Sequence, residues 1–217
     1  MSPKLIVTNI KVSLKLPKNA TSRLDYVEKR CLRLDIPCTK KSSSMLTIRH
    51  KKVTYTLFGM KSELFKGRSV MQNLQHCNIA GLKMLERIED AATDVFLIVN
   101  KRIPAAMDYT IDNICCNIDM LQKIDLEKFY LCEDKIGISF HPESFPSAKV
   151  TGWVRCLTCQ VFACGKLIFI GGKKLSDIKS FFTFLNDKLS PYIIFDQPSP
   201  AGEERAHAQR THQLHIN

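Results

Sequence analysis

Cysteine is the residue type in this sequence with the most obvious capacity for chemistry, because a thiolate can attack a substrate or bind a metal. The 217-residue chain has nine cysteines at irregular spacing. Cys156 and Cys159 have the C-x-x-C spacing of half a zinc site. If residues 156–163 form a strand, however, the odd spacing directs the two thiols to opposite faces, and no second pair with suitable spacing is evident. The sequence therefore does not favour zinc.

Other catalytic arrangements find equally little support. A cysteine nucleophile with His141 as its base lacks a third residue to orient the base. Residues 61–67 (KSELFKG) lack the glycines and the G-K-[ST] ending of a phosphate-binding loop. His207, His212 and His215 lie in a polar stretch without periodicity, which is typical of a disordered tail. We expect a protein that is not an enzyme and that uses no cofactor or metal.

The charge of the chain is concentrated in its first half. The net charge is +11, and residues 1–107 contain 20 Lys and Arg but only 8 Asp and Glu, against 12 and 13 in residues 108–217. This asymmetry indicates a polyanionic partner that meets mainly the first half, although a solubilising surface explains the same charge. No apolar run approaches the ~20 residues that span a bilayer, and the first residues lack the layout of a signal peptide. We expect reduced thiols in an intracellular protein.

Strand patterns dominate the elements that must position any site. Residues 4–16 alternate, with Ile10, Val12 and Leu14 facing one way and polar or basic residues the other, as in a half-buried strand. Residues 160–172 (QVFACGKLIFIGG) predict two strands joined by a tight turn at Cys164 and Gly165.

The sequence also repeats itself at an offset of 104 residues. Asn9-Ile10 matches Asn113-Ile114, Phe58 matches Phe162, and Gly67 matches Gly171. Equal spacings predict two homologous halves. We expect a first repeat over 1–91, a linker over 92–103, a second repeat over 104–195 and a disordered tail over 196–217.

Each half is predicted to run strand, helix, antiparallel strands and long helix, an α+β arrangement. The first-half elements expected are a helix over 22–34 with Ser22 as a possible N-cap, a basic loop over 37–44, strands over 45–50 and 52–58, a hairpin partner over 61–67 and the longest helix over 69–90. Val95–Val99 should form a short strand or dock on the core. The second-half elements expected are a strand over 109–120, a short helix over 124–132, strands over 135–141, 148–163 and 166–171 and a helix over 174–190.

One face of each sheet should then remain uncovered by helices. It would carry Asn9, Lys11, Ser13, Thr54, Thr56, Phe58 and Lys66 in the first half, and Asn113, Cys115, Asn117, Thr158, Gln160, Phe162, Ile168 and Ile170 in the second. An exposed face that mixes amides, aliphatic side chains and phenylalanine indicates a binding partner.

These motifs together resemble the TATA-box-binding protein family over about residues 4–195. The strongest matches are residues 109–114 (YTIDNI), 141–146 (HPESFP), 161–166 (VFACGK) and 170–173 (IGGK). The first half matches more loosely, through Asn9-Ile10, Ile48-Arg49, Leu57-Phe58 and Gly67. The resemblance implies a two-repeat saddle of the helix-grip kind. In it, a curved antiparallel sheet carries helices on its convex face and leaves its concave face open.

By this resemblance the open face would bind double-stranded, A·T-rich promoter DNA in the minor groove and bend it by phenylalanine insertion. In the family one Asn per half contacts central bases, and Asn9 and Asn113 occupy those positions. An amide can donate to adenine N3 and thymine O2, although each Asn can instead tie its strand to a neighbouring turn. The DNA-binding positions implied are Asn9, Lys11, Lys41, Arg49, Thr56, Phe58, Leu64, Lys66, Asn113, Cys115, Phe145, Gln160, Phe162, Ile168 and Ile170.

The chain departs from the family pattern mainly in its first half. Phe145 and Phe162 keep both wedge phenylalanines of the second half, whereas in the first half Phe58 keeps one and the other falls on Lys41. A lysine unstacks bases poorly but can hold a phosphate, and Lys40 should lie beside it. The groove-lining positions also change, with Lys11 and Cys115 in place of valine and Lys66 and Ile170 in place of threonine. We therefore do not expect a strict TATA preference.

Further residues and partners follow from the same resemblance. Arg49, Lys61, Lys66, Lys166 and Lys173 could reach phosphates. Glu143 matches an acidic turn residue that contacts transcription factor IIB, so a factor of that kind and the RNA polymerase machinery are expected partners. The expected location is the nucleus, or a cytoplasmic factory if the protein is viral. The alternatives are a saddle-fold module that binds protein or RNA without bending DNA, and an enzyme accessory domain.

Overall fold

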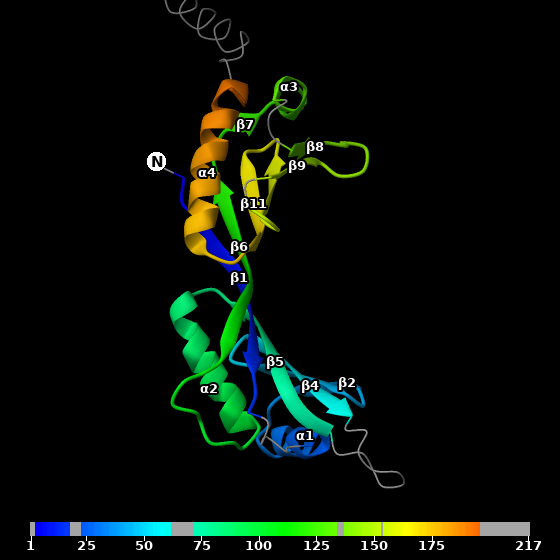
Figure 1. The fold of residues 1–217 in the computed structure, drawn as a ribbon. Coiled ribbons are helices and arrows are strands. Elements are labelled where there is room, and N and C mark those ends of the chain that lie inside the picture. The colour runs from blue at the N-terminus through cyan, green and yellow to red at the C-terminus, as the bar shows by residue number, and fades with distance from the viewer. Residues whose placement is uncertain (1–2, 18–22, 62–71, 134–136, 153, 196–217) are drawn as a thin grey trace, which may run out of the picture.

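The computed structural model describes residues 3–17, 23–61, 72–133, 137–152 and 154–195 (Figure 1). Ten strands form one sheet in the order β2-β3-β4-β5-β1-β6-β11-β10-β9-β8, in which every neighbouring pair is antiparallel. The order is symmetric about the β1–β6 pair, with four strands of one repeat on either side. The curved sheet and its helices therefore form the α+β saddle that the sequence predicts.

The strands of the large sheet and the α-helices recur in the same order in both repeats. The first repeat contains β1 (Ile6–Lys15), α1 (Leu24–Arg33), β2 (Cys38–Ser42), β3 (Met45–His50), β4 (Val53–Lys61), β5 (Gln72–Leu82), the 3-10 turn η1 (Leu85–Arg87) and α2 (Ile88–Ile98). The second contains β6 (Tyr109–Asp119), β7 (Lys123–Ile124), α3 (Leu126–Cys132), β8 (Gly137–Ser139), β9 (Ser147–Thr151), β10 (Thr158–Phe162), β11 (Lys166–Gly172), α4 (Leu175–Leu189), η2 (Ser190–Tyr192) and β12 (Ile193–Ile194). β12 pairs with β7.

The core lies between one face of the sheet and the helices. Strand alternation directs Ile10, Val12 and Leu14 of β1 into this core, where each side chain is fully buried. Figure 1 shows α2 and α4 along the same side of the central strands. Within α2, Val95 and Ile98 are buried, so the apolar segment of the predicted linker docks on the core as a helix. No helix in the described part of the chain is both long and apolar enough to cross a membrane.

The two repeats meet where β1 pairs with β6. Ile10 opposes Ile114, Asn9 opposes Cys115 and Lys11 opposes Asn113. The last two pairs are equivalent under the internal repeat, because adding the offset of 104 turns Asn9 into Asn113 and Lys11 into Cys115. The register shifts once on each side of this centre, between Val7 and Asn9 and between Lys11 and Val12.

The long helix predicted over residues 69–90 is wrong, because residues 72–82 form the strand β5. The misleading signal was the three-residue spacing of buried side chains, from Leu74 to Cys77 and from Ile79 to Leu82. The register of β5 shifts at these two places, against β4 and against β1. Each β-bulge adds a residue to a strand and so lengthens its two-residue period to three, which imitates a helix.

Other first-repeat predictions change with this correction. The basic loop expected over 37–44 is mostly the strand β2, which pairs with β3. The partner of β4 is β5, whereas the hairpin partner predicted over 61–67 falls almost entirely outside the described residues, as do Ser22, Leu64, Lys66, Gly67 and the tail over 196–217. The N-cap residue of α1 is Arg23, whose side chain makes no capping hydrogen bond.

The second repeat follows its predicted elements closely. β6, α3, β11 and α4 lie within two residues of their expected bounds. The single strand expected over 148–163 is instead two strands, β9 and β10. The tight turn is confirmed, because the Gly165 N–H donates to the Phe162 carbonyl at 2.8 Å. Asp125 caps α3 by accepting from the Lys128 N–H at 3.1 Å.

Gly171 should be the least replaceable glycine near the centre of the sheet. Its φ is +89°, and an added Cβ would lie 1.8 Å from the Cys156 carbonyl oxygen. Gly152 has a similar φ of +98°, but nothing lies within 4 Å of its Cβ position. Urea denaturation should show that Gly152→Ala costs about 1 kcal/mol of unfolding free energy through backbone strain alone. Gly171→Ala should cost more than about 3 kcal/mol, because the steric clash adds to that strain. Equal losses would contradict this packing.

Candidate nucleic-acid interface

The face of the ten-stranded sheet opposite the helices, called the open face below, has no layer of the described chain over it. Cross-strand pairing places Lys11, Ser13, Thr54, Thr56 and Phe58 there in the first repeat. In the second repeat it places Cys115, Asn117, Thr158, Gln160, Phe162, Ile168 and Ile170 there. All of these side chains are half-buried except Ile170, which is 37% exposed. The predicted face therefore exists and is a continuous surface.

Asn9 and Asn113 sit at equivalent places on the two central strands. The Asn9 Oδ1 accepts the Gly81 N–H at 2.8 Å, and the Asn113 Oδ1 accepts the Gly171 N–H at 2.8 Å. Both glycines have positive φ, +98° and +89°. The structural counterpart of Gly171 is thus Gly81, and the match to Gly67 drawn from equal spacing is wrong.

These two hydrogen bonds fix which end of each amide faces outward. A backbone N–H can only donate, so the atom that meets it must be the amide oxygen. The amino groups of Asn9 and Asn113 are thereby turned away from the glycines. The Asn113 Nδ2 lies 3.3 Å from the Cys115 sulfur, a weak acceptor on the open face. Each Asn therefore ties two strands together and presents a hydrogen-bond donor.

The second repeat carries an aromatic pair at the outer part of the open face. The Phe145 and Phe162 rings lie edge to face with centroids 6.2 Å apart. Phe162 ends β10, and Phe145 is 49% exposed in the connection between β8 and β9. In that connection the Ser144 and Phe145 N–H groups both donate to the His141 carbonyl at 3.0 Å, and Glu143 is exposed.

The first repeat carries a different ring pair. Phe58 stacks on His76 of β5 at 4.7 Å with an angle of 16° between the ring planes. The connection between β2 and β3 is only Ser43 and Ser44, so it offers no counterpart of Phe145. Lys41 is exposed near the end of β2, at a shift in its register with β3.

The basic residues of the first repeat do not all serve the open face. The Lys40 ammonium bonds to Asp25 and lies 3.9 Å from Glu28, both on α1, so its expected place beside the interface is wrong. The hydrogen bond between Lys40 and Asp25 raises the pKa of the Lys40 ammonium and lowers the pKa of the Asp25 carboxyl. Strand alternation explains the result, because Lys40 opposes the buried Leu46.

Arg49 remains a good candidate for a phosphate contact. It is exposed and opposes Thr54 of the open face. Lys166 and Lys173 are also exposed. The side chain of Lys61 and all of Lys66 and Leu64 lie outside the described residues, so these assignments stay predictions.

Sequence reasoning missed several residues of the open face. In the first repeat these are Met45, Thr47, His76, Asn78 and Ala80, and in the second they include Lys149, which opposes Gln160. The omission of His76, Asn78 and Ala80 follows from taking β5 for a helix. The strong alternation of Cys77 and Ile79 with polar neighbours was the available signal.

The cysteines that suggested zinc lie in different surroundings. Cys156 is exposed in the turn before β10, whereas Cys159 is fully buried. Burial raises the pKa of the Cys159 thiol, and a protonated buried thiol is unreactive. Among the described residues, no three His, Cys, Asp or Glu side chains are placed to hold one metal ion.

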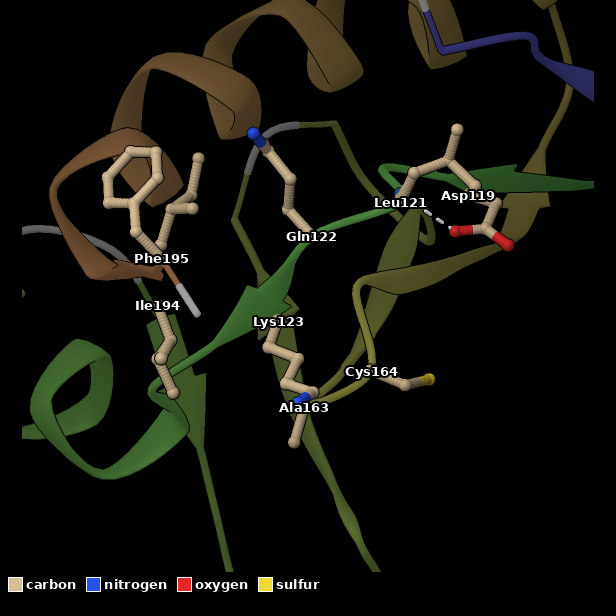
Figure 2. A pocket seen from close by; sticks show the side chains of 9 residues that line it. Asp119, Leu121, Gln122, Lys123, Ala163, Cys164, Ile194 and Phe195 are labelled. Carbon is tan, nitrogen blue, oxygen red and sulfur yellow. Dashed lines mark hydrogen bonds between the residues drawn. The ribbon is translucent and has the colours of Figure 1, made fainter. Parts of the chain in front are cut away.

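A hollow of about 730 Å³ lies at the far end of the second repeat, where β6 ends (Figure 2). Its lining residues are Asp119, Leu121, Gln122, Lys123, Ala163, Cys164, Ile193, Ile194 and Phe195. The Leu121 N–H donates to the Asp119 carboxylate at 2.9 Å at its rim. No predicted DNA-binding residue lines this hollow, so it is separate from the open face.

A two-repeat sheet with helices on one face and an open second face defines a saddle protein. Residues 108–192 match the family described as transcription factor TFIID, or TATA-binding protein. The solved structure of the Methanococcus jannaschii TATA-binding protein is similar, with a TM-score of 0.65 and 18% identity over 87% of this chain and 99% of that one. No curated protein sequence matches.

The second repeat is thus related by sequence, and the whole chain by fold, to the same proteins. The second repeat therefore matches the TATA-binding protein family in sequence, and the whole chain shares the fold of a solved member of that family. This is a family of DNA-binding transcription factors rather than of enzymes.

Proposed function

We propose that the protein is a transcription initiation factor that binds the minor groove of promoter DNA through its open face and bends it. The observation that carries this proposal is the pair of amides at the centre of the sheet. The Asn9 and Asn113 side-chain oxygens each accept a glycine N–H at 2.8 Å, which leaves each amino group on the side away from the glycine. Two donors match the minor groove of A·T pairs, which presents only the acceptors adenine N3 and thymine O2.

The second repeat supplies the wedge. Phe145 is half exposed, and its ring packs against Phe162 at the edge of the open face. Apolar side chains that insert between base steps unstack them and kink the duplex, a mode that the TATA-binding protein itself exemplifies. The first repeat presents Phe58 already stacked on His76, together with Lys11 and Arg49. In this proposal the first repeat holds DNA mainly through its charge, and the second repeat bends it.

The remaining surfaces would then serve other proteins. Glu143 is exposed in the connection next to Phe145, where a factor IIB-like protein could contact it beside the bent DNA. His141 and Ser144 flank this acidic residue, so the partner surface would differ from that of the relatives. Such a function places the protein in the nucleus, or in a cytoplasmic viral factory.

The central experiment compares the two asparagines with matched variants. Asn9→Ala and Asn113→Ala should each lower the preference for an A·T-rich over a G·C-rich duplex by about tenfold, because a lost base contact costs roughly 1–3 kcal/mol. Asn113→Asp keeps an oxygen for the Gly171 N–H but loses the donor. Fluorescence anisotropy with both duplexes should therefore show the same loss of A·T preference for Asn113→Asp as for Asn113→Ala. The melting temperature of Asn113→Asp should lie closer to that of the unmodified protein than the melting temperature of Asn113→Ala does. A uniform loss of affinity for both duplexes would refute the base contact.

The bending role of the second repeat can be measured separately. The double variant Phe145→Ala and Phe162→Ala should abolish bending, because no ring remains there to unstack a base step. Energy transfer between dyes at the two DNA ends reports the bend. Phe195→Ala, which removes an exposed ring away from the open face, is the control and should leave the transfer efficiency unchanged. If the double variant still bends DNA, Phe145 and Phe162 are not the residues that kink it. If the unmodified protein binds DNA without bending it, the alternative of a non-bending module is favoured.

Salt dependence tests which cations face the DNA. Each lost phosphate contact should reduce the slope of log affinity against log salt by roughly one unit. Arg49→Gln should show this reduction. Lys40→Gln removes the same charge from a neighbouring strand, but Lys40 is held by α1, so its slope should stay within about 0.3 units of the unmodified protein's. Titrations of one duplex between low and physiological salt would give the slope for each variant. Equal slopes for Arg49→Gln and Lys40→Gln would mean that Arg49 does not contact a phosphate in the way proposed.

A further inference from the structure

A polar cluster on the open face of the first repeat has no equivalent in the second. The Ser13 Oγ lies 2.7 Å from the Asp112 Oδ2 and 3.1 Å from the Asn78 Oδ1. Ser13 opposes Asn78 across the β1–β5 pair. Asp112 reaches the same place because the β1–β6 register skips it between Asn113 and Ile111. A bulge of this kind re-aims a side chain.

The symmetry of the sheet shows how unusual this cluster is. Adding 104 carries Ser13 onto Asn117, and Thr8 onto Asp112. The position equivalent to Asn78 is Ile168, because Asn78 opposes Thr56 as Ile168 opposes Gln160. The surroundings of Asn117 therefore offer the aliphatic Ile168 and a threonine, Thr8, where the surroundings of Ser13 offer an amide and a carboxylate. The Thr8 hydroxyl donates to the Cys115 carbonyl at 3.2 Å.

The single hydroxyl hydrogen of Ser13 decides what the cluster presents. It cannot be donated to two acceptors, and the shorter contact to the charged carboxylate is the stronger one. A half-turn of the Asn78 amide then lets its amino group donate to the Ser13 Oγ. This arrangement turns the Asn78 oxygen outward and leaves the second oxygen of Asp112 as another acceptor. The cluster thus presents acceptors only, the opposite of Asn9 and Asn113.

Acceptors have one complementary group in the minor groove. A·T pairs present only acceptors there, whereas guanine adds its N2 amino group, which is a donor. We propose that Asp112 and Asn78 read a guanine N2 amino group next to the centre of the site, on the first-repeat side. This inference rests on the proposed function, since it requires the open face to lie in the minor groove. The preferred site is then A·T pairs at the centre and a G·C pair on one side only.

Inosine supplies the sharpest probe, because it lacks the N2 amino group of guanine but keeps its major-groove edge. A series of A·T-rich duplexes carries a single G·C pair, placed at a different position in each. The affinity for each duplex is compared with the affinity for the same duplex in which inosine replaces that guanine. The unmodified protein should bind the guanine duplex about five- to tenfold more tightly than the inosine duplex at one position on one side of the centre.

Two variants with a charge-matched control assign the effect. Asp112→Asn, which replaces the carboxylate with an amide, and Asn78→Ile, which installs the second-repeat residue, should each reduce the preference for guanine to less than about twofold. Asp90→Asn removes the same charge from the exposed side of α2 and should keep the preference. Either of these two variants suffices if the other folds poorly.

The possible outcomes separate this inference from the proposed function. Failure to bind any duplex overturns the proposed function and this inference with it. Equal affinity for the guanine and inosine duplexes at every position overturns this inference but leaves the proposed function intact. A preference for guanine that survives both Asp112→Asn and Asn78→Ile assigns the contact to other residues and also overturns this inference.

Discussion

The antiparallel pairing of β1 with β6 is the interaction on which the rest of the structure depends. It joins two sheets of five strands into one sheet of ten, so neither central strand is left with an open edge. It also sets the register that places Asn9 and Asn113 at equivalent points about Ile10 and Ile114. The open face can be continuous only because this seam is continuous.

Two hydrogen bonds transmit that register to the neighbouring strands. Gly81 and Gly171 have positive φ, and their N–H groups point at the amide oxygens of β1 and β6. Gly171 also approaches the Cys156 carbonyl so closely that no Cβ fits. The outward amino groups are therefore held by backbone geometry on both sides of the seam. In the proposed function, the amino groups that contact bases are thus set by the same two hydrogen bonds that fix the sheet.

The sequence predicts the second repeat well and the first repeat less well, for physical reasons. In the second repeat, β10 and β11 alternate without a break and are joined by three residues, so their period is plain. In the first repeat, two bulges give β5 a helical spacing, and ten residues separate it from β4. The cross-strand pair of Phe58 with His76 depends on this pairing, and the contact of Lys40 with Asp25 depends on how α1 packs beside β2, so neither could be predicted.

Near-twofold symmetry has a consequence for direction. A perfectly symmetric saddle would sit equally well on a duplex in either orientation, and a promoter bound that way would have no upstream or downstream side. Here the two halves differ, with a stacked Phe58 and His76 in one and an edge-to-face Phe145 and Phe162 in the other. If the protein bends DNA as proposed, these unequal ends would make one orientation lower in free energy. The differences between the repeats would then give the proposed complex a polarity, which transcription from one strand requires.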